Sequence, residues 1–240
     1  MLSGVYSAAA ALRTAEFHQD VIATNLAHMN VPGFRRSVAS IATFAEQLAA
    51  EEANEPGHGN FVDTLDTDFS MGPLVQTGRN LDMAIGGDGF FVVQGTNESL
   101  YTRSGTFQIG ENGVLVGTHG MPILGESGPL SIPSDVSTSQ ITIASDGTVT
   151  AGEDRIGKLR LARFEDNARL KVVGTTLFSA EEAALAAGEV SVVQGVREQS
   201  NVQPVDELVA MILAARYHEA AQRTLTSIDS AIQQQTDPQG

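Results

Sequence analysis

Cysteine and tryptophan are both missing from this 240-residue chain. Without cysteine, the protein can form no disulfide bond and can use no thiol in catalysis. Basic residues are scarce, because 14 Lys and Arg stand against 29 Asp and Glu, and the formal net charge is −15. Binding to nucleic acid or to an anionic lipid surface relies on clustered basic side chains. We therefore expect no nucleic-acid partner.

Long apolar runs are missing as well. No stretch reaches the roughly 20 apolar residues of a membrane span, so we expect no membrane insertion. The N-terminal segment carries Arg13, Glu16 and Asp20, so it lacks the uniform apolar core of a cleavable signal peptide. The protein is expected either to stay inside the cell or to leave by a route that does not use such a signal.

The common short motifs of catalysis and metal binding do not occur. The five histidines form no HxxxH, HxH or HExxH pair, and no GxSxG, GxGxxG or Walker pattern is present. Asp63, Asp66 and Asp68 lie close together, but they lack the glycine and the downstream glutamate of an EF-hand loop. We predict that the protein is not an enzyme, with no catalytic residue, no cofactor and no metal site.

The N-terminal region has the apolar spacing of a long helix, expected from about Ser3 to Asn30. Pro32 and Gly33 mark its end. Seam positions alternate three and four residues apart, as in about four heptads of a coiled coil. Few of them are large, so an isolated helix of this kind is marginal in water and becomes stable on packing. The seam consists of Val5, Ala8, Leu12, Ala15, Gln19, Ile22, Leu26 and Met29.

A second long helix is expected at the other end, starting after Asn201 or near Pro204 and running to about Gln235. Proline suits a first helical turn, and Asp206 and Glu207 suit the positive end of the helix dipole. Its apolar residues form two adjoining stripes. The first contains Val205, Leu208, Ile212 and Ala215, and the second contains Met211, Ala214, Ala221, Leu225, Ile228 and Ile232.

Between the helices the pattern favours short antiparallel strands. An Asn-Gly or Asp-Gly turn between apolar runs is typical of a β-hairpin, which predicts hairpins across 111–113 and 145–147. Residues 37–71 are acidic, and the spacing of Ile41, Phe44 and Leu48 allows a short helix. The expected strands are 90–94, 106–109 with 114–116, 140–144 with 148–150, 156–164 and 188–193.

The predicted fold class is therefore α+β: long N- and C-terminal helices form a coiled-coil layer, and a central domain is rich in antiparallel β-structure. The expected organisation is an N-terminal assembly helix at 1–36, an acidic connection at 37–71, a central β-domain at 72–197 and a C-terminal assembly helix at 198–240.

Four blocks, in order along nearly the whole chain, resemble the bacterial flagellar axial family of hook and rod proteins. His28-Met29-Asn30 departs from the usual family sequence, and Pro204 is a second departure. The resemblance is strongest to proximal-rod members, with distal-rod members second. The blocks are ATNLAHMNVPGFR at 23–35, LDMAI with GFFVV at 81–93, YTRSGTF with NGVLV at 101–116, and SNV with ELVAMI at 200–212.

The resemblance implies a structural subunit that stacks helically, with terminal helices lining a hollow axis and the β-domain outside, and that transmits torque to the hook. Implied partners are other flagellar rod and hook subunits, copies of itself and the flagellar type III export apparatus. The implied location is the periplasmic rod of the basal body, reached from the cytoplasm without a cleaved signal peptide. We expect the assembly interface to include Val5, Leu12, Gln19, Ile22, Asn25, Leu26, Met29, Gly33, Val205, Leu208, Ile212, Leu225 and Ile228.

Two other readings of the residues remain. One is a ligand-binding or enzymatic β-domain with oligomerising helices, which would show a pocket with convergent polar groups in the middle segment. The other is an autonomous coiled-coil adaptor, which would have helical ends in the free monomer.

Overall fold

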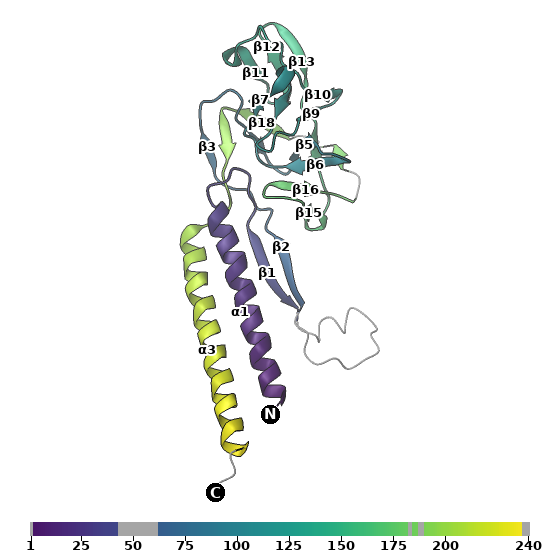
Figure 1. Cartoon of the computed structure of the whole chain (residues 1–240). Helices are drawn as coiled ribbons and strands as arrows, with labels where there is room; N and C mark the ends of the chain where they lie inside the picture. Colours follow the sequence, from purple (N-terminus) through teal and green to yellow (C-terminus); the bar gives the residue numbers. More distant parts are fainter. Residues whose placement is uncertain (1, 43–61, 182–183, 187–189, 237–240) are drawn as a thin grey trace. The chain divides into compact units, whose positions relative to one another are not determined.

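The computed structural model describes residues 2–42, 62–181, 184–186 and 190–236 (Figure 1). The chain divides into two compact units. The helical unit contains 1–27, 37–68 and 203–240, and the β unit contains 28–36 and 69–202. The chain therefore passes from one unit to the other four times.

Within the described residues, the helical unit contains two helices, α1 (Leu2–His28) and α3 (Pro204–Thr236). They pack side by side and run in opposite directions (Figure 1). Both predicted helices are confirmed to within about two residues at each end. At the end of α1, the Val31 amide donates to the His28 carbonyl at 3.0 Å, and Gly33 takes a positive φ of 72° that turns the chain away.

An antiparallel pair of strands also belongs to the helical unit. Its strands are β1 (Ser37–Ala42) and β2 (Val62–Thr67), with Ser37 opposite Thr67. Ile41 therefore lies in a strand, so the short helix predicted there is wrong at this residue, while Phe44 and Leu48 lie outside the described residues. The β-branched side chains of Val38 and Ile41 favour an extended backbone, and pairing with β2 decides the outcome.

The β unit is built from antiparallel strands. Its largest sheet has six strands in the order β15-β16-β6-β5-β14-β17, and a three-stranded sheet has the order β11-β12-β13. The remaining pairs are β18 with β4, β19 with β3, β7 with β8 and β10 with β9.

The strands are β3 (Leu74–Gln76), β4 (Met83–Gly86), β5 (Phe90–Gln94), β6 (Ser99–Thr102), β7 (Gln108–Ile109), β8 (Leu115–Val116), β9 (Leu124–Gly125), β10 (Gly128–Pro129), β11 (Ile141–Ile143), β12 (Thr148–Ala151), β13 (Asp154–Lys158), β14 (Leu161–Arg163), β15 (Lys171–Val172), β16 (Leu177–Ser179), β17 (Leu185–Ala186), β18 (Ser191–Gln194) and β19 (Val196–Glu198). Short 3-10 turns lie at Glu111–Gly113, Thr138–Gln140 and Asn167–Arg169.

Both predicted hairpins are confirmed. Between β7 and β8, Asn112 and Gly113 have φ values of 58° and 77°, which is why an Asn-Gly pair occupies this turn. Between β11 and β12, the Asp146 carboxylate accepts hydrogen bonds from the Thr148 amide at 3.0 Å and the Thr148 hydroxyl at 2.8 Å. These bonds hold the pKa of Asp146 below its usual value.

Two strand predictions need correction. The single strand expected at 156–164 is two strands, β13 and β14. Between them Leu159 is buried and forms an isolated antiparallel bridge with Gly125, with the Arg160 amide donating to the Leu124 carbonyl, so the chain changes pairing partner here. The last strand expected at 188–193 is β18 at Ser191–Gln194, and a further strand, β19, follows it and was not predicted.

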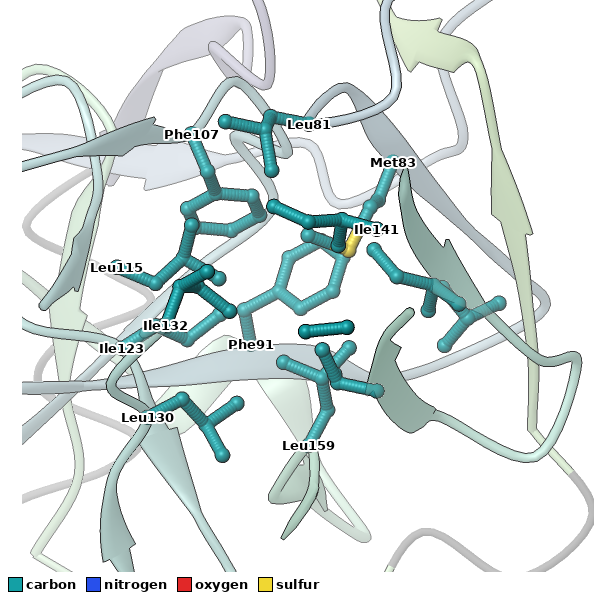
Figure 2. Packing of buried hydrophobic residues seen from close by; sticks show 14 of the residues in the cluster. Leu81, Met83, Phe91, Phe107, Leu115, Ile123, Leu130, Ile132, Ile141 and Leu159 are labelled. Carbon is teal, nitrogen blue, oxygen red and sulfur yellow. The ribbon is translucent and has the colours of Figure 1, made fainter. Parts of the chain in front are cut away.

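The core of the β unit is made of large side chains. Phe91 and Phe107 meet edge to face with ring centroids 5.2 Å apart, surrounded by aliphatic residues (Figure 2). A second cluster gathers Phe69, Phe164 and Phe178 around Phe90. Each fully buried side chain of this size contributes roughly 1.5–3 kcal/mol, so this unit has its own hydrophobic core.

Candidate assembly interface

Alanine dominates the surface along which α1 and α3 meet. Ala8 and Ala15 on α1 are buried, as are Ala214 and Ala221 on α3. Contacts along the pair follow an antiparallel order. A Cβ added at Gly4 would lie 3.5 Å from Ile228 Cδ1, and the Glu16 carboxylate lies 3.6 Å from His218 Nε2. Small side chains allow close approach of the helix backbones, but they bury little apolar area.

A buried polar group closes one end of this seam. Asn25 is 1% exposed and Glu207 is 0% exposed. The Asn25 amide nitrogen donates to the Ser37 carbonyl at 2.8 Å and to Glu207 Oε2 at 3.4 Å, while its amide oxygen accepts from the Ser37 amide at 2.8 Å. One side chain thus connects α1, β1 and the first turn of α3.

An open apolar groove follows the helix pair. It encloses about 700 Å³ and has threonine and histidine side chains among its alanines. Leu213 and Tyr217 are its largest exposed apolar residues, and Tyr217 is 71% exposed. Its walls are Ala11, Thr14, Ala15, His18 and Ile22 from α1, and Ala210, Leu213, Ala214, Tyr217, Ala220, Ala221 and Thr224 from α3.

In the N-terminal turns of α3, the face turned away from α1 is also apolar. We call this surface the outer stripe, and it consists of Val205, Leu208, Val209 and Ile212, which are 72%, 54%, 53% and 56% exposed. Residues three, four and seven apart share one side of a helix. The outer stripe is therefore opposite the side that carries Glu207, Ala214 and Ala221. A helix that is apolar on two sides is typical of one that packs against more than one neighbour.

The predicted interface residues fall into three groups. Ile22, Asn25 and Gly33 are buried within the chain, and Val205, Leu208 and Ile212 are exposed. The second C-terminal stripe, rather than the first, faces α1. Gly33 belongs to the β unit and not to the helix pair. The half-buried group is Val5, Leu12, Gln19, Leu26, Met29, Leu225 and Ile228.

A buried ionic cluster in the β unit was not predicted. Glu198 is 0% exposed, and its Oε1 accepts from Arg35 Nη2 at 2.6 Å and from the Gly72 amide at 2.9 Å. Its Oε2 lies 3.5 Å from Arg103 Nη1. Burial lowers the pKa of Arg103, against the opposing effect of the Glu198 charge. Because Arg35 and Glu198 are 163 residues apart, no local pattern could connect them.

Two glycines let the backbone come close at this cluster. The Gly33 amide donates to the Glu198 carbonyl at 3.0 Å, and a Cβ at Gly33 would lie only 2.3 Å from the Ser104 nitrogen. A Cβ at Gly72 would lie 2.1 Å from the Gln199 carbonyl oxygen. Neither position accepts a side chain without movement of the backbone.

Other kinds of site find little support in the described parts of the chain. Within them, no group of three or more His, Asp or Glu residues is arranged to hold a metal ion. Among the described helices, none has both the length and the apolar character needed to cross a membrane. In the β unit, a cavity beside His119 and Thr176 encloses about 10 Å³, which is too small for a ligand.

Two family models match this chain. The model of the flagellar hook protein FlgE/F/G D1 domain matches residues 84–151, within the β unit. The model of the flagellar basal body rod FlgEFG protein C-terminal region matches residues 193–237, which include β19 and α3. The second match therefore covers the outer stripe and one wall of the groove.

Similar proteins extend over nearly the full chain. The basal-body rod protein FlgF of Salmonella typhimurium is 34% identical over 94% of this chain and 93% of its own length. FlgF of Caulobacter vibrioides is 32% identical over 86% of this chain and 85% of its own length. The basal-body rod protein FlgG of Bacillus subtilis is 28% identical over 98% of both chains.

Proposed function

We propose a mode of assembly for this chain, starting from its family: it belongs to the FlgE/F/G family of flagellar basal-body rod proteins. It is accordingly a structural, non-enzymatic subunit of the flagellar basal-body rod, and it assembles with other rod subunits. Our proposal is that it polymerises helically through α1 and α3, and that the resulting rod transmits torque to the hook.

The outer stripe of α3 is the observation that supports this mode of assembly. Leu208 and Ile212 are large, apolar and more than half exposed in the single chain. Full burial of such a side chain contributes roughly 1.5–3 kcal/mol, so covering the part that is still exposed contributes about half of that for each residue. Burial of the four residues of the outer stripe would contribute a substantial part of the free energy of a subunit contact. In the single chain these residues remain exposed.

The second supporting observation is that the stripe and the groove are different surfaces. The groove is lined mainly by alanine and threonine, whereas the outer stripe consists of Val, Leu and Ile. When one surface of a subunit fits a different surface of the next, the contact is head-to-tail and repeats without closing unless the rotation returns to the start. A contact of this kind generates a helical filament such as a rod.

We further propose its neighbours and its route. Rod and hook subunits and copies of this chain are its partners in the periplasmic rod. The flagellar type III export apparatus carries it from the cytoplasm without a cleaved signal peptide. The alanine seam supports this route, because a weakly held helix pair opens easily before export. The FlgF proteins of Salmonella typhimurium and Caulobacter vibrioides are 34% and 32% identical to this chain, against 28% for FlgG of Bacillus subtilis, which supports a proximal position in the rod, with a distal position as the alternative.

A charged residue in the outer stripe tests the proposal. We expect Ile212→Asp, and likewise Leu26→Asp on α1, to abolish motility and incorporation into isolated basal bodies, while denaturant unfolding of the β unit stays unchanged. Val172→Asp is the matched control, because Val172 is 53% exposed against 56% for Ile212 and lies in the β unit. Normal swimming with Ile212→Asp, or equal loss with Val172→Asp, would refute assembly through this stripe.

Limited proteolysis of dilute monomer gives an independent test. We expect cuts before about residue 35 and beyond about residue 200 to appear long before cuts within 72–195, because the helix pair opens more often than the β unit. Equal resistance of the ends and the centre would favour the autonomous coiled-coil adaptor over an assembly-dependent subunit.

A further inference from the structure

Small residues recur every seven residues in the α1–α3 seam. On α1 the buried residues Ala8 and Ala15 are seven apart, with Ile22 one heptad further, and on α3 Ala214 and Ala221 are seven apart. A slide of α3 by one heptad would bring Ala221 to the level that Ala214 occupies. These alanines therefore do not by themselves define the register of the helix pair.

The polar end of the seam breaks this repeat. Glu207 is one heptad before Ala214, and it faces Asn25. A slide that brought Ala214 opposite Asn25 would remove the carboxylate acceptor from a buried amide. A slide in the opposite direction would move Glu207 one heptad along the seam, to the level of His18 and away from Asn25. Both slides remove the bond between Asn25 and Glu207, so each shifted register loses a buried polar contact that the observed register has.

Asn25 is well suited to act as the fixed point. It exchanges two hydrogen bonds with the backbone of Ser37, one in each direction and each 2.8 Å long. Its amide is therefore held in one orientation by β1, independently of α3. Glu207 lies in the first turn of α3, where the positive end of the helix dipole stabilises a carboxylate.

We propose that Asn25 and Glu207 are positioning residues that set the register of α1 against α3. The register decides which groove residues of α1 face which groove residues of α3. It therefore determines the shape of the surface that the helix pair offers to a neighbour. This inference concerns contacts within one chain, so it does not depend on the proposed mode of polymerisation.

Disulfide trapping in this cysteine-free chain can measure the register. Glu16→Cys with His218→Cys reports the observed register, since these side chains are 3.6 Å apart. Glu16→Cys with Leu225→Cys, and Glu16→Cys with Met211→Cys, report the two registers shifted by one heptad. Each double-cysteine variant is oxidised in dilute full-length protein. The relative rates of cross-linking in the three variants report the relative populations of the three helix registers, even when the helices associate only briefly.

We expect the observed-register pair to cross-link at least about tenfold faster than either shifted pair in the otherwise unchanged chain. In Asn25→Leu/Glu207→Leu, which exchanges the polar contact for an apolar one, we expect this preference to fall to about threefold or less. Glu207→Gln keeps an acceptor for Asn25 and should retain the preference.

A merely structural role for the pair predicts a different result. In that case the double variant would lower helix content and slow all three cross-links together, leaving their ratio unchanged. The inference is overturned by that outcome, by a tenfold preference that survives in the double variant, or by the absence of any preference in the unchanged chain.

Discussion

The two units of this protein bury apolar surface in opposite ways. In the β unit the largest side chains point inward, and Phe90, Phe91 and Phe107 are at most 1% exposed. In the helical unit the buried contact is made mostly by alanine, while the large residues Leu208 and Ile212 are on the outside. The β unit thus holds its own core, whereas the helical unit leaves several of its large apolar residues exposed.

Buried polar groups follow the same contrast. The β unit encloses full charges, with Glu198 between Arg35 and Arg103, and all three are at most 3% exposed. The helical unit encloses one carboxylate beside an amide. Both contacts join segments that are far apart in the sequence. The ionic cluster lies within the β unit and depends on its completed fold, while the Asn25–Glu207 contact is proposed to select one register of the helix pair.

The largest expected effect tests whether the stability of the β unit comes from its own hydrophobic core. We expect Phe91→Ala to lower the free energy of unfolding of this unit by about 4 kcal/mol, because it leaves a cavity among Met83, Phe107 and Ile141. Denaturant unfolding of the purified chain measures this change. Val172→Ala, at an exposed strand edge, should change the free energy of unfolding by no more than about 0.5 kcal/mol. Equal losses in the two variants would contradict the view that the β unit is stabilised by its buried core.

The next largest effect concerns the ionic cluster. Glu198→Ala should lower the free energy of unfolding of the β unit by about 3 kcal/mol, because two buried arginines lose their counter-charge. Glu198→Gln should lose less, since an amide oxygen can still accept from Arg35 and from the Gly72 amide. Chemical denaturation compares both with Glu165→Ala, an exposed carboxylate on the same unit. If Glu198→Ala behaves like Glu165→Ala, the cluster does not stabilise the fold.

Overpacking the helix seam should have a smaller and strictly local effect. Ala214→Leu forces a large side chain between α1 and α3 and should weaken their pairing by about 1–2 kcal/mol. The readout is tryptic cleavage after Arg13 and Arg223, which we expect to accelerate by about tenfold while the β unit resists. Ala215→Leu, on the exposed side of α3, is the control. Faster cleavage in the β unit as well would mean that the two units are not independent.

The smallest effect is a pH dependence in the hairpin between β11 and β12. The folded-state pKa of Asp146 is held below the ordinary value of 3.8 by its bonds to Thr148. A lowered folded pKa stabilises the fold above the unfolded pKa, and this stabilisation is lost as the pH falls through the folded pKa. The protection factor of the Thr148 amide, which is its exchange rate in the unstructured chain divided by its rate in the protein at the same pH, should therefore fall on acidification below about pH 4. Asp146→Asn should remove this pH response. If the response persists in Asp146→Asn, another titrating group causes it.

Local patterns were sufficient for the parts of the fold that depend on local chemistry. The two terminal helices follow from apolar spacing together with Pro32, Gly33 and Pro204, and the hairpin turns follow from Asn112-Gly113 and Asp146-Gly147. Pairing between distant segments could not be predicted in this way. The β1–β2 hairpin and the contact of Glu198 with Arg35 depend on what the folded chain brings together, and no periodicity marks them.

The candidate interface was predictable in part for the same reason. The apolar character of Leu208 and Ile212 is evident from spacing, but spacing alone does not say which of two adjoining stripes faces α1. The structure assigns that role to the stripe with Ala214 and Ala221, since small residues allow the helices to approach and large ones would hold them apart. Whether the outer stripe contacts a neighbouring subunit stays a prediction.

The ionic cluster also limits how freely the middle of this chain can be exchanged between relatives. Residues 69–202 form one continuous insertion between two segments of the helical unit, which suggests a segment that can be exchanged as one piece. Their Glu198, however, is neutralised by Arg35, which lies outside that stretch. A chimaera that transplants only 69–202 keeps Arg103 beside Glu198, but the residue in the place of Arg35 comes from the recipient. Successful recombination within this family should therefore move the segment around Arg35 together with the insertion.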